Sequence, residues 1–205
     1  NLSEFSQALE YYGRALAIDE EIGNTAGVAT HLGNIGIVYW SLSDYSRALN
    51  YYSKALALDE KLGNKARVTT HLGNLGGVHD SLGEYDLALE YYDKALGIAQ
   101  ALGDRAAEAR HLGNIGLVHM NLSDYSRALE FYGKAAAIAE EIGYTSGLAI
   151  HLGNIGIVHI NLSNCEQALE YLNKALAIDE ELGNKEGVAA WLGTLGVAYS
   201  QPDCR

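Results

Sequence analysis

Apolar residues recur at intervals of three, four and seven along most of the chain. In the stretch 45–62 they are Tyr45, Ala48, Leu49, Tyr52, Ala55, Leu56 and Leu62. The positions between them hold polar or charged residues such as Arg47 and Lys54. This spacing matches the turn of an α-helix and predicts an amphipathic helix with one buried face. Gly63 is suited to end this helix in a left-handed conformation, and Asn64 can cap the next one.

A second helical stripe lies just before the first. It consists of Val28, Leu32, Ile35, Tyr39 and Leu42. This helix is expected to stop at Ser43, after which Asp44 can cap the following helix. Because only a few residues connect the two stripes, neighbouring helices must be antiparallel.

Both stripes recur every 40 residues without insertion or deletion. The hexapeptide 31–36, His-Leu-Gly-Asn-Ile-Gly, returns at 71–76, 111–116 and 151–156, and in altered form at 191–196. A fixed period of this length is typical of a solenoid of stacked helix pairs. We therefore expect an all-α chain in which residues 1–205 form one array of five units. The ten expected helices are 5–22, 25–42, 45–62, 65–82, 85–102, 105–122, 125–142, 145–162, 165–182 and 185–201.

Composition and charge narrow the classes of partner. The chain is 48% hydrophobic, has one proline and contains no apolar run approaching 18 residues, so a soluble protein without a membrane span is expected. Its formal charge of −12 would repel nucleic acids and anionic lipid surfaces. Two cysteines are too few for a disulfide framework, which favours the cytoplasm. Because the chain does not start with Met, a fragment of a longer protein or assembly is expected.

These residues resemble the tetratricopeptide family. Its pattern is matched in one unit by Leu32, Ile35, Gly36, Tyr39, Ala48, Tyr52 and Ala55. Glu60 replaces the closing proline of the family, and the unit is longer than the usual length of about 34 residues. With the Leu-Gly-Asn signature, these departures resemble the long-repeat subgroup that includes Pins-type polarity scaffolds, with kinesin light chains as distant relatives. The resemblance implies a right-handed α-solenoid, the tetratricopeptide superhelix, with the first helix of each antiparallel pair lining a concave groove.

A partly apolar strip on the first helices is the candidate peptide-binding groove. Helical rotation puts its members on a face away from the packing stripe, and their identity changes from repeat to repeat. The candidate residues are Thr30, Asn34, Ile37, Trp40, Thr70, Asn74, Asp80, Arg110, Asn114, Leu117, Met120, Asn154, Ile157 and Ile160. The alternative is that the apolar members pack between adjacent first helices as ordinary core.

The asparagines in this strip form a ladder that suits gripping an extended peptide backbone, because an amide offers both a donor and an acceptor. Satisfying the neighbouring helix is the alternative. Trp40 is the expected anchor, and its replacement by alanine should weaken binding by about 2 kcal/mol or more without unfolding. The two-cation clamp of some family members is not expected, because Gly33, Ile37 and Thr70 occupy the matching positions.

Two glycines recur in every unit. Glycine inside a helix lowers stability by about 1 kcal/mol relative to alanine, so its recurrence needs a compensating gain. We expect Gly36 and its equivalents to provide this gain by allowing close contact with the small alanine of the partner helix. Gly33 and its equivalents either let a ligand backbone approach or serve helix packing.

No residue set predicts catalysis, a metal or a cofactor. The histidines within one unit, such as His71 and His79, are eight residues apart and so about 12 Å along a helix, too far to share an ion. We expect them to be packed with a satisfied ring nitrogen, and Cys165 to be a core residue. The carboxylates at 19–21, 140–141 and 179–181 are expected to be solvated.

The sequence thus favours a non-catalytic scaffold that binds a protein or peptide segment with an apolar centre and basic flanks. The alternatives are a self-associating array, or the regulatory arm of a larger signalling protein attached to a kinase or cyclase. Self-association is suggested by the chain ends, where Leu192, Leu195 and Tyr199 would face water. The N-terminal helix carries the complementary face, which predicts a head-to-tail homo-oligomer or filament.

Overall fold

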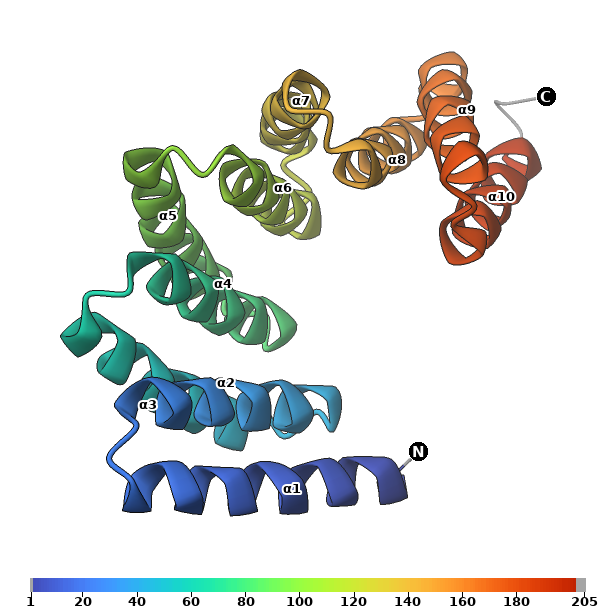
Figure 1. The fold of residues 1–205 in the computed structure, drawn as a ribbon. Coiled ribbons are helices and arrows are strands. Elements are labelled where there is room, and N and C mark those ends of the chain that lie inside the picture. The colour runs from blue at the N-terminus through green and yellow to red at the C-terminus, as the bar shows by residue number, and fades with distance from the viewer. Residues whose placement is uncertain (1, 202–205) are drawn as a thin grey trace. The chain divides into compact units, whose positions relative to one another are not determined.

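The computed structural model describes residues 2–201, which form ten α-helices and no strand (Figure 1). The helices are α1 (Leu2–Glu21), α2 (Thr25–Ser41), α3 (Tyr45–Leu62), α4 (Lys65–Ser81), α5 (Tyr85–Leu102), α6 (Arg105–Asn121), α7 (Tyr125–Glu141), α8 (Thr145–Asn161), α9 (Cys165–Leu182) and α10 (Lys185–Ser200). All ten predicted helices are present, with bounds that differ from the prediction by at most three residues. The all-α prediction is therefore confirmed for the described residues.

The chain divides into two compact units, residues 1–102 with α1–α5 and residues 103–205 with α6–α10. Within each unit every helix packs against the helices that precede and follow it in the sequence. In the second unit α6 also contacts α8, and α8 contacts α10, so alternate helices are stacked. The even-numbered helices correspond to the first helix of each predicted pair. A single array over residues 1–205 stays a prediction.

Short connections and side-chain caps set the helix bounds. The side chains of Asp44 and Asn64 each accept a hydrogen bond from the backbone N–H three residues on, as predicted. Gly63 ends α3 with a φ of 69°, the left-handed conformation expected of it. Ser43 adopts a φ of 58° in the turn after α2, where the next repeat has Gly83. The same turn geometry is thus kept even where the residue is not glycine.

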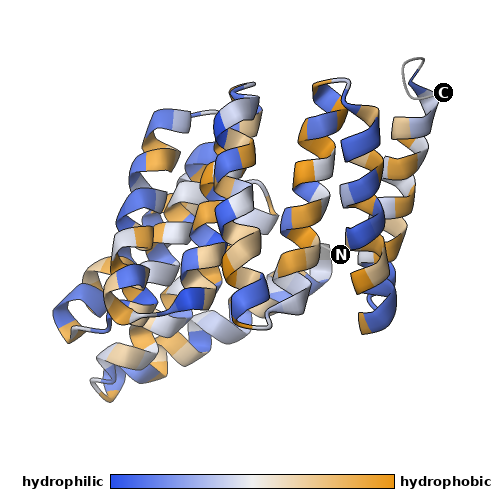
Figure 2. Ribbon diagram, turned by 90° about the horizontal axis from the view of Figure 1, so that it is seen from above, coloured by the Kyte–Doolittle hydropathy of each residue, from blue (hydrophilic) through white to orange (hydrophobic). Residues whose placement is uncertain are grey.

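The buried face of each helix pair repeats along with the sequence. On α3, Ala48 and Tyr52 are completely buried and pack with Leu75 and Val78 of α4. In the second unit the equivalent cluster contains Ala128, Tyr132, Ile155 and Val158. Figure 2 shows hydrophobic and hydrophilic residues interleaved along the helices, as amphipathic packing requires.

The constant glycine on the even-numbered helices lies directly beneath a side chain of the next helix. A Cβ atom added to Gly36 would lie 2.7 Å from Cε1 of Tyr52, and one added to Gly76 would lie 2.8 Å from Cε1 of Tyr92. The predicted close contact is therefore present, but its partner is a tyrosine ring instead of the alanine we expected. At Gly156 the partner is the side chain of Leu172.

The glycine three positions earlier also serves helix packing. A Cβ atom at Gly33 would lie 2.9 Å from Cε1 of His71, on the next even-numbered helix. Gly113 is covered in the same way by His151. Of the two interpretations of this position, the contacts favour packing between successive even-numbered helices.

The glycine contacts predict opposite effects for the same substitution within one unit. Gly76→Ala should lower the free energy of unfolding by about 1–3 kcal/mol, because the new Cβ would collide with Tyr92. Gly97→Ala should raise it by about 1 kcal/mol, because Gly97 lies in α5 with no atom within 4 Å of an added Cβ. Urea unfolding of both variants measures the difference, and equal effects would contradict the packing role of Gly76.

Candidate functional site

The predicted groove residues all lie on α2, α4, α6 and α8, the even-numbered helices. Their exposure differs. Ile37 is 49% exposed, and Arg110 and Thr70 are also exposed. Ile160 is only 8% exposed and belongs to the core cluster with Trp191, so it packs between helices as the alternative interpretation held. Asn34, Asn74, Asp80, Asn114, Leu117, Met120, Asn154 and Ile157 are half-buried.

Trp40, the expected anchor, is half-buried between α2 and α4. A Cβ atom at Gly77 would lie 2.5 Å from Cη2 of its ring. Its Nε1 donates a hydrogen bond to Oγ of Ser81 at 3.3 Å, and its ring meets that of Tyr52 edge-on. The indole therefore joins two even-numbered helices, and loss of this ring would cost packing as well as any contact with a ligand.

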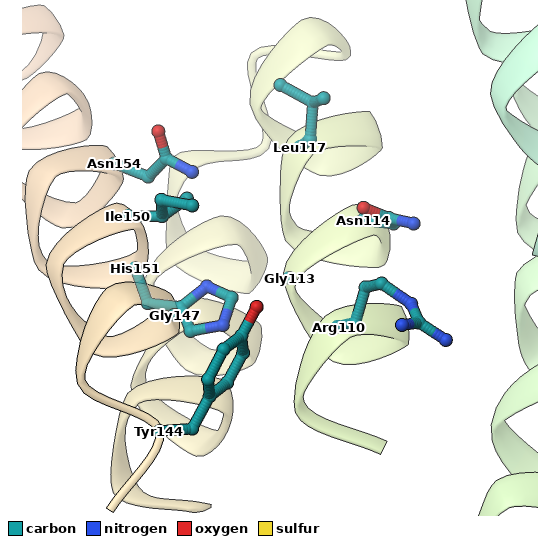
Figure 3. Close-up of a pocket in the computed structure, with 9 residues that line it drawn as sticks. All are labelled: Arg110, Gly113, Asn114, Leu117, Tyr144, Gly147, Ile150, His151 and Asn154. Carbon is teal, nitrogen blue, oxygen red and sulfur yellow. The ribbon is translucent and has the colours of Figure 1, made fainter. Parts of the chain in front are cut away.

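A cavity of about 290 Å³ lies between α6 and α8 (Figure 3). Four of the predicted groove residues line it: Arg110, Asn114, Leu117 and Asn154. The other lining residues were not among the predicted groove residues; they are Gly113, Tyr144, Gly147, Ile150 and His151. Figure 3 shows the rings of Tyr144 and His151 side by side in the space facing Gly113.

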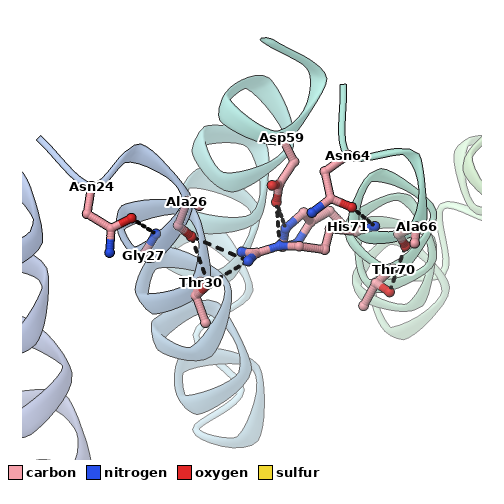
Figure 4. A network of polar contacts seen from close by, with 10 residues as sticks. Asn24, Ala26, Gly27, Thr30, Asp59, Asn64, Ala66, Thr70 and His71 are labelled. Atoms are coloured by element: carbon pink, nitrogen blue, oxygen red, sulfur yellow. Dashed lines mark hydrogen bonds and ion pairs between the residues drawn. The ribbon is translucent and has the colours of Figure 1, made fainter. Parts of the chain in front are cut away.

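In the first unit the equivalent space is occupied by an arginine side chain. Nε of Arg67 donates to Oδ2 of Asp59 at 2.9 Å. Its Nη1 donates to the carbonyl oxygen of Ala26 at 3.3 Å and to Oγ1 of Thr30 at 2.6 Å (Figure 4). Arg67 thus reaches from α4 to α2 and fills the groove between them. Thr30, a predicted groove residue, is used for this internal contact.

Two repeats later, Gly147 occupies the position of Arg67 and opens the space. The ring of Tyr144 covers Gly147, since it is the nearest side chain to a Cβ added there. Tyr144 is at the N-cap of α8 and makes no side-chain capping bond, whereas Asn64 at the same repeat position caps α4. The ring of Tyr144 therefore lines the cavity, but α8 lacks a side-chain cap, which lowers the stability of this helix by about 1 kcal/mol.

A buried aspartate recurs twelve residues before a ring on the next helix. Nε2 of His71 lies 2.9 Å from Oδ2 of Asp59, and Nε1 of Trp191 donates to Oδ2 of Asp179 at 2.7 Å. In the 40-residue repeat that contributes to the cavity, Ala139 occupies the position of this aspartate. As a result, both ring nitrogens of His151 are buried without a hydrogen-bond partner.

Two expectations about polar residues are corrected by these contacts. Asp179 was expected to be solvated, but it is 2% exposed and accepts hydrogen bonds from Trp191 and Asn184. The glutamates beside it are exposed, as expected. A satisfied ring nitrogen was expected for every histidine. It is present in His71 but absent in His111 and His151, because no aspartate occupies the position twelve residues before either of them.

Burial keeps two histidines of the second unit uncharged, His151 in the wall of the cavity and His111 on α6. It lowers the pKa of His111 and of His151 to about 4, so both imidazoles are uncharged at pH 7. Burial also lowers the pKa of His71, and the neighbouring Asp59 opposes this effect. Among the cavity-lining residues Arg110 is the one with a full charge, and none is a carboxylate. The exposed cation of Arg110 and the buried, unpartnered imidazole of His151 distinguish this cavity within a chain of charge −12.

Neither a metal cluster nor a membrane-spanning helix is found among residues 2–201. No three histidine, cysteine, aspartate or glutamate side chains in that range are grouped so that they could hold an ion. Every described helix is too short or too polar to cross a bilayer.

Sequence comparison identifies the repeat. A family model described as tetratricopeptide repeat matches residues 2–61, 67–141 and 147–203. The chain belongs to the tetratricopeptide repeat family. No curated protein matches its sequence.

Solved structures share the tetratricopeptide fold of this chain at low sequence identity. Aspartyl phosphate phosphatase F from Bacillus subtilis is 20% identical with a TM-score of 0.89, over 98% of this chain and 54% of that protein. BtubC (BKLC) from P. vanneervenii is 18% identical with a TM-score of 0.82, over 95% of this chain and 83% of that protein. A Rap protein complexed with Competence and Sporulation Factor is 20% identical with a TM-score of 0.82, over 92% and 53%. The chain thus spans about half of two of these proteins.

His151, whose ring nitrogens have no hydrogen-bond partner, predicts that the free energy of unfolding depends on pH. Its folded pKa of about 4 is below the ordinary value of 6.5, so its contribution is complete above pH 6.5 and is lost as the pH falls toward 4. Between pH 7.5 and pH 5 this loss amounts to about 2 kcal/mol. His151→Phe should reduce the loss by that amount, as measured by urea unfolding at both pH values.

The control for this experiment is His71→Phe. Because it removes a bond to the buried Asp59, it should lower the free energy of unfolding at pH 7.5 already. A His151→Phe variant with the pH dependence of the unaltered chain would contradict the assignment of a neutral, unpartnered imidazole.

Proposed function

We propose that this chain is a non-catalytic scaffold that binds a peptide segment of a partner protein along α6 and α8, with one peptide side chain in the cavity between them. The observation that carries this proposal is the cavity itself, which is lined by the exposed Arg110, by Asn114 and Asn154, and by the buried imidazole of His151. Both nitrogens of this ring are buried without a hydrogen-bond partner, which costs about 1–3 kcal/mol, and a ligand that turned the ring toward a polar group would recover that loss. A protein of this fold has also been solved in complex with Competence and Sporulation Factor.

The chemistry of the cavity favours an acidic or amide side chain. A neutral imidazole offers one donor and one acceptor, and the amides of Asn114 and Asn154 line the cavity with it. Arg110 at the edge can pair with a carboxylate. Leu117 and Ile150 supply apolar contact for the stem of such a side chain. Glutamate, glutamine, aspartate or asparagine would therefore fit, whereas the guanidinium that Arg67 supplies in the first unit would be repelled by Arg110.

The asparagine ladder would hold the peptide backbone on either side of this anchor. Asn114 and Asn154 are half-buried on the two helices that border the cavity. Within the described residues they have no hydrogen bond to a neighbouring helix, so their amides are available to a ligand. The acidic surface of the chain would still favour basic residues in the flanks of the peptide, outside the cavity.

The subgroup of the tetratricopeptide family to which the chain belongs is proposed from the sequence. The Leu-Gly-Asn signature and the 40-residue unit support membership of the long-repeat subgroup.

Selection from a random peptide library displayed on phage tests the ligand chemistry. We expect enriched peptides to share an acidic or amide residue beside an apolar one. Arg110→Glu should weaken the binding of an enriched acidic peptide by about tenfold or more, since it places a like charge at the cavity edge. Fluorescence titration of the labelled peptide measures the loss.

Arg127→Glu is the matched control for this titration. Arg127 is also exposed and in the second unit, but it lies on α7 and does not line the cavity. The control should bind the peptide with nearly unchanged affinity. Equal losses in the two variants, or a selection that enriches only basic peptides, would contradict the proposed site.

A further inference from the structure

The side chain of Arg67 on α4 is bound by atoms from two other helices of the first unit. Its Nε donates to Oδ2 of Asp59 on α3 at 2.9 Å. Its Nη1 donates to the carbonyl oxygen of Ala26 at 3.3 Å and to Oγ1 of Thr30 at 2.6 Å, both on α2 (Figure 4). A carboxylate and two neutral acceptors are partners that suit a planar cation. The first unit therefore contains a guanidinium site, and Arg67 occupies it.

Asp59 makes this site specific for a cation. Its side chain is completely buried, and its Oδ2 is shared between Nε of Arg67 and Nε2 of His71. Its other oxygen, Oδ1, is buried without a hydrogen-bond partner. A buried carboxylate is unfavourable unless a cation lies beside it. An acidic or uncharged ligand that displaced Arg67 would therefore leave Asp59 without its counterion.

The repeat does not need an arginine at this position. The other copies have glycine at 27, 147 and 187 and alanine at 107. In the first copy the equivalent aspartate, Asp19, instead accepts a hydrogen bond from the amide of Asn24 at 2.8 Å. Asn184 donates to Asp179 in the same way at 2.9 Å. A capping asparagine can thus serve the aspartate, so the contacts of Arg67 with α2 are an addition to the common repeat.

Arg67 fills the part of the groove that corresponds to the cavity of the second unit. It has the repeat position of Gly147, which lines that cavity, and Thr30 has the position of Arg110. In the first unit the cation comes from α4 and is already paired with Asp59. In the second unit the cation comes from α6, and no carboxylate lines the cavity with it. The first segment thus satisfies its own charge, whereas the second presents a cation to a ligand.

Trp40 fills the same groove segment farther along α2. A Cβ atom added to Gly77 of α4 would lie 2.5 Å from Cη2 of the indole ring. Nε1 of this ring donates to Oγ of Ser81, the last residue of α4. Side chains of the chain itself, Arg67 and Trp40, therefore bridge α2 and α4 near both ends of α4.

We propose that Arg67 is an internal ligand that closes the groove segment between α2 and α4 to partner peptides. The peptide is then bound by α6 and α8 alone. This inference rests on the proposed function and adds to it the residue that restricts binding to one segment. With glycine at position 67, the first unit would bind the arginine side chain of a partner in place of its own.

Arg67→Gly tests whether the site accepts a guanidinium from outside the chain. The variant should fold, because glycine has this position in three other copies and the amide of Asn64 can donate to the free Oδ1 of Asp59. The probe is N-acetylarginine methylamide. Its binding, measured by isothermal titration calorimetry, should be at least about tenfold tighter for the variant than for the unaltered chain. The NMR signals of the His71 imidazole should shift on binding, because this ring shares Oδ2 of Asp59.

Two controls separate this site from a general attraction to an acidic chain. N-acetylcitrulline methylamide has a similar shape without the charge, so it should bind Arg67→Gly at least about tenfold more weakly than the arginine probe. Arg47→Gly removes an exposed arginine of the same unit, which pairs with Asp44. This variant should bind the arginine probe no better than the unaltered chain. Arg67→Ala, which introduces the residue found at 107, should behave like Arg67→Gly.

The outcomes distinguish this site from the cavity of the second unit. An acidic peptide enriched by the selection should bind the unaltered chain at a single site. Arg110→Glu should leave the binding of the arginine probe to Arg67→Gly unchanged, because Arg110 belongs to the second unit. A selection without acidic peptides would contradict the proposed function, whereas the arginine probe still decides whether Arg67 occupies a guanidinium site.

Three results would overturn the proposal. The first is a folded Arg67→Gly or Arg67→Ala chain that does not bind the arginine probe. The second is equal binding of the arginine and citrulline probes. The third is a second site for the acidic peptide in the unaltered chain.

Discussion

The contact of a bulky side chain with a helical glycine is the interaction on which the rest of the structure depends. It recurs at two positions of the unit, with Tyr52 over Gly36 and His71 over Gly33. Because glycine lacks a Cβ atom, the ring can lie against the helix backbone and bring the two helices close together. The glycines weaken each helix alone, so the fold gains its stability only when consecutive helices are packed.

Much of the fold could be predicted because the period of the sequence repeats every element. The helix bounds, the caps at Asp44 and Asn64 and the left-handed Gly63 follow from local chemistry that one unit displays. The prediction that an alanine covers Gly36 was wrong, because an alanine and a tyrosine on the same face of the next helix both fit the spacing. Side-chain direction, which the spacing alone does not reveal, decides which of the two reaches the backbone of the glycine.

The candidate site was only partly predictable, since it arises where units differ. Helical rotation identified Asn114 and Leu117 from a face shared by all units. Gly147 and Ala139 were missed because their effect is the absence of the side chains that Arg67 and Asp59 have at the same repeat positions. A comparison of the five copies could have found Ala139, since aspartates recur at 19, 59 and 179 and alanine interrupts the series at 99 and 139. It would not have found Gly147, because glycine also occupies this position at 27 and 187 and Arg67 is the exception.

Stacked rings between consecutive helices bear on how the length of a repeat protein can change. The four pairs are Tyr39–Tyr51, His79–Tyr91, His119–Phe131 and His159–Tyr171. Because each pair is formed by residues at the same two positions of the repeat, the even-numbered helix of one pair carries a ring that matches the odd-numbered helix of another. Duplication or deletion of a whole 40-residue segment in the gene would therefore join helices whose rings still match. Loss of a shorter segment would shift the register and place the rings on different faces. The chain can thus gain or lose units by recombination without new mutations at the junction.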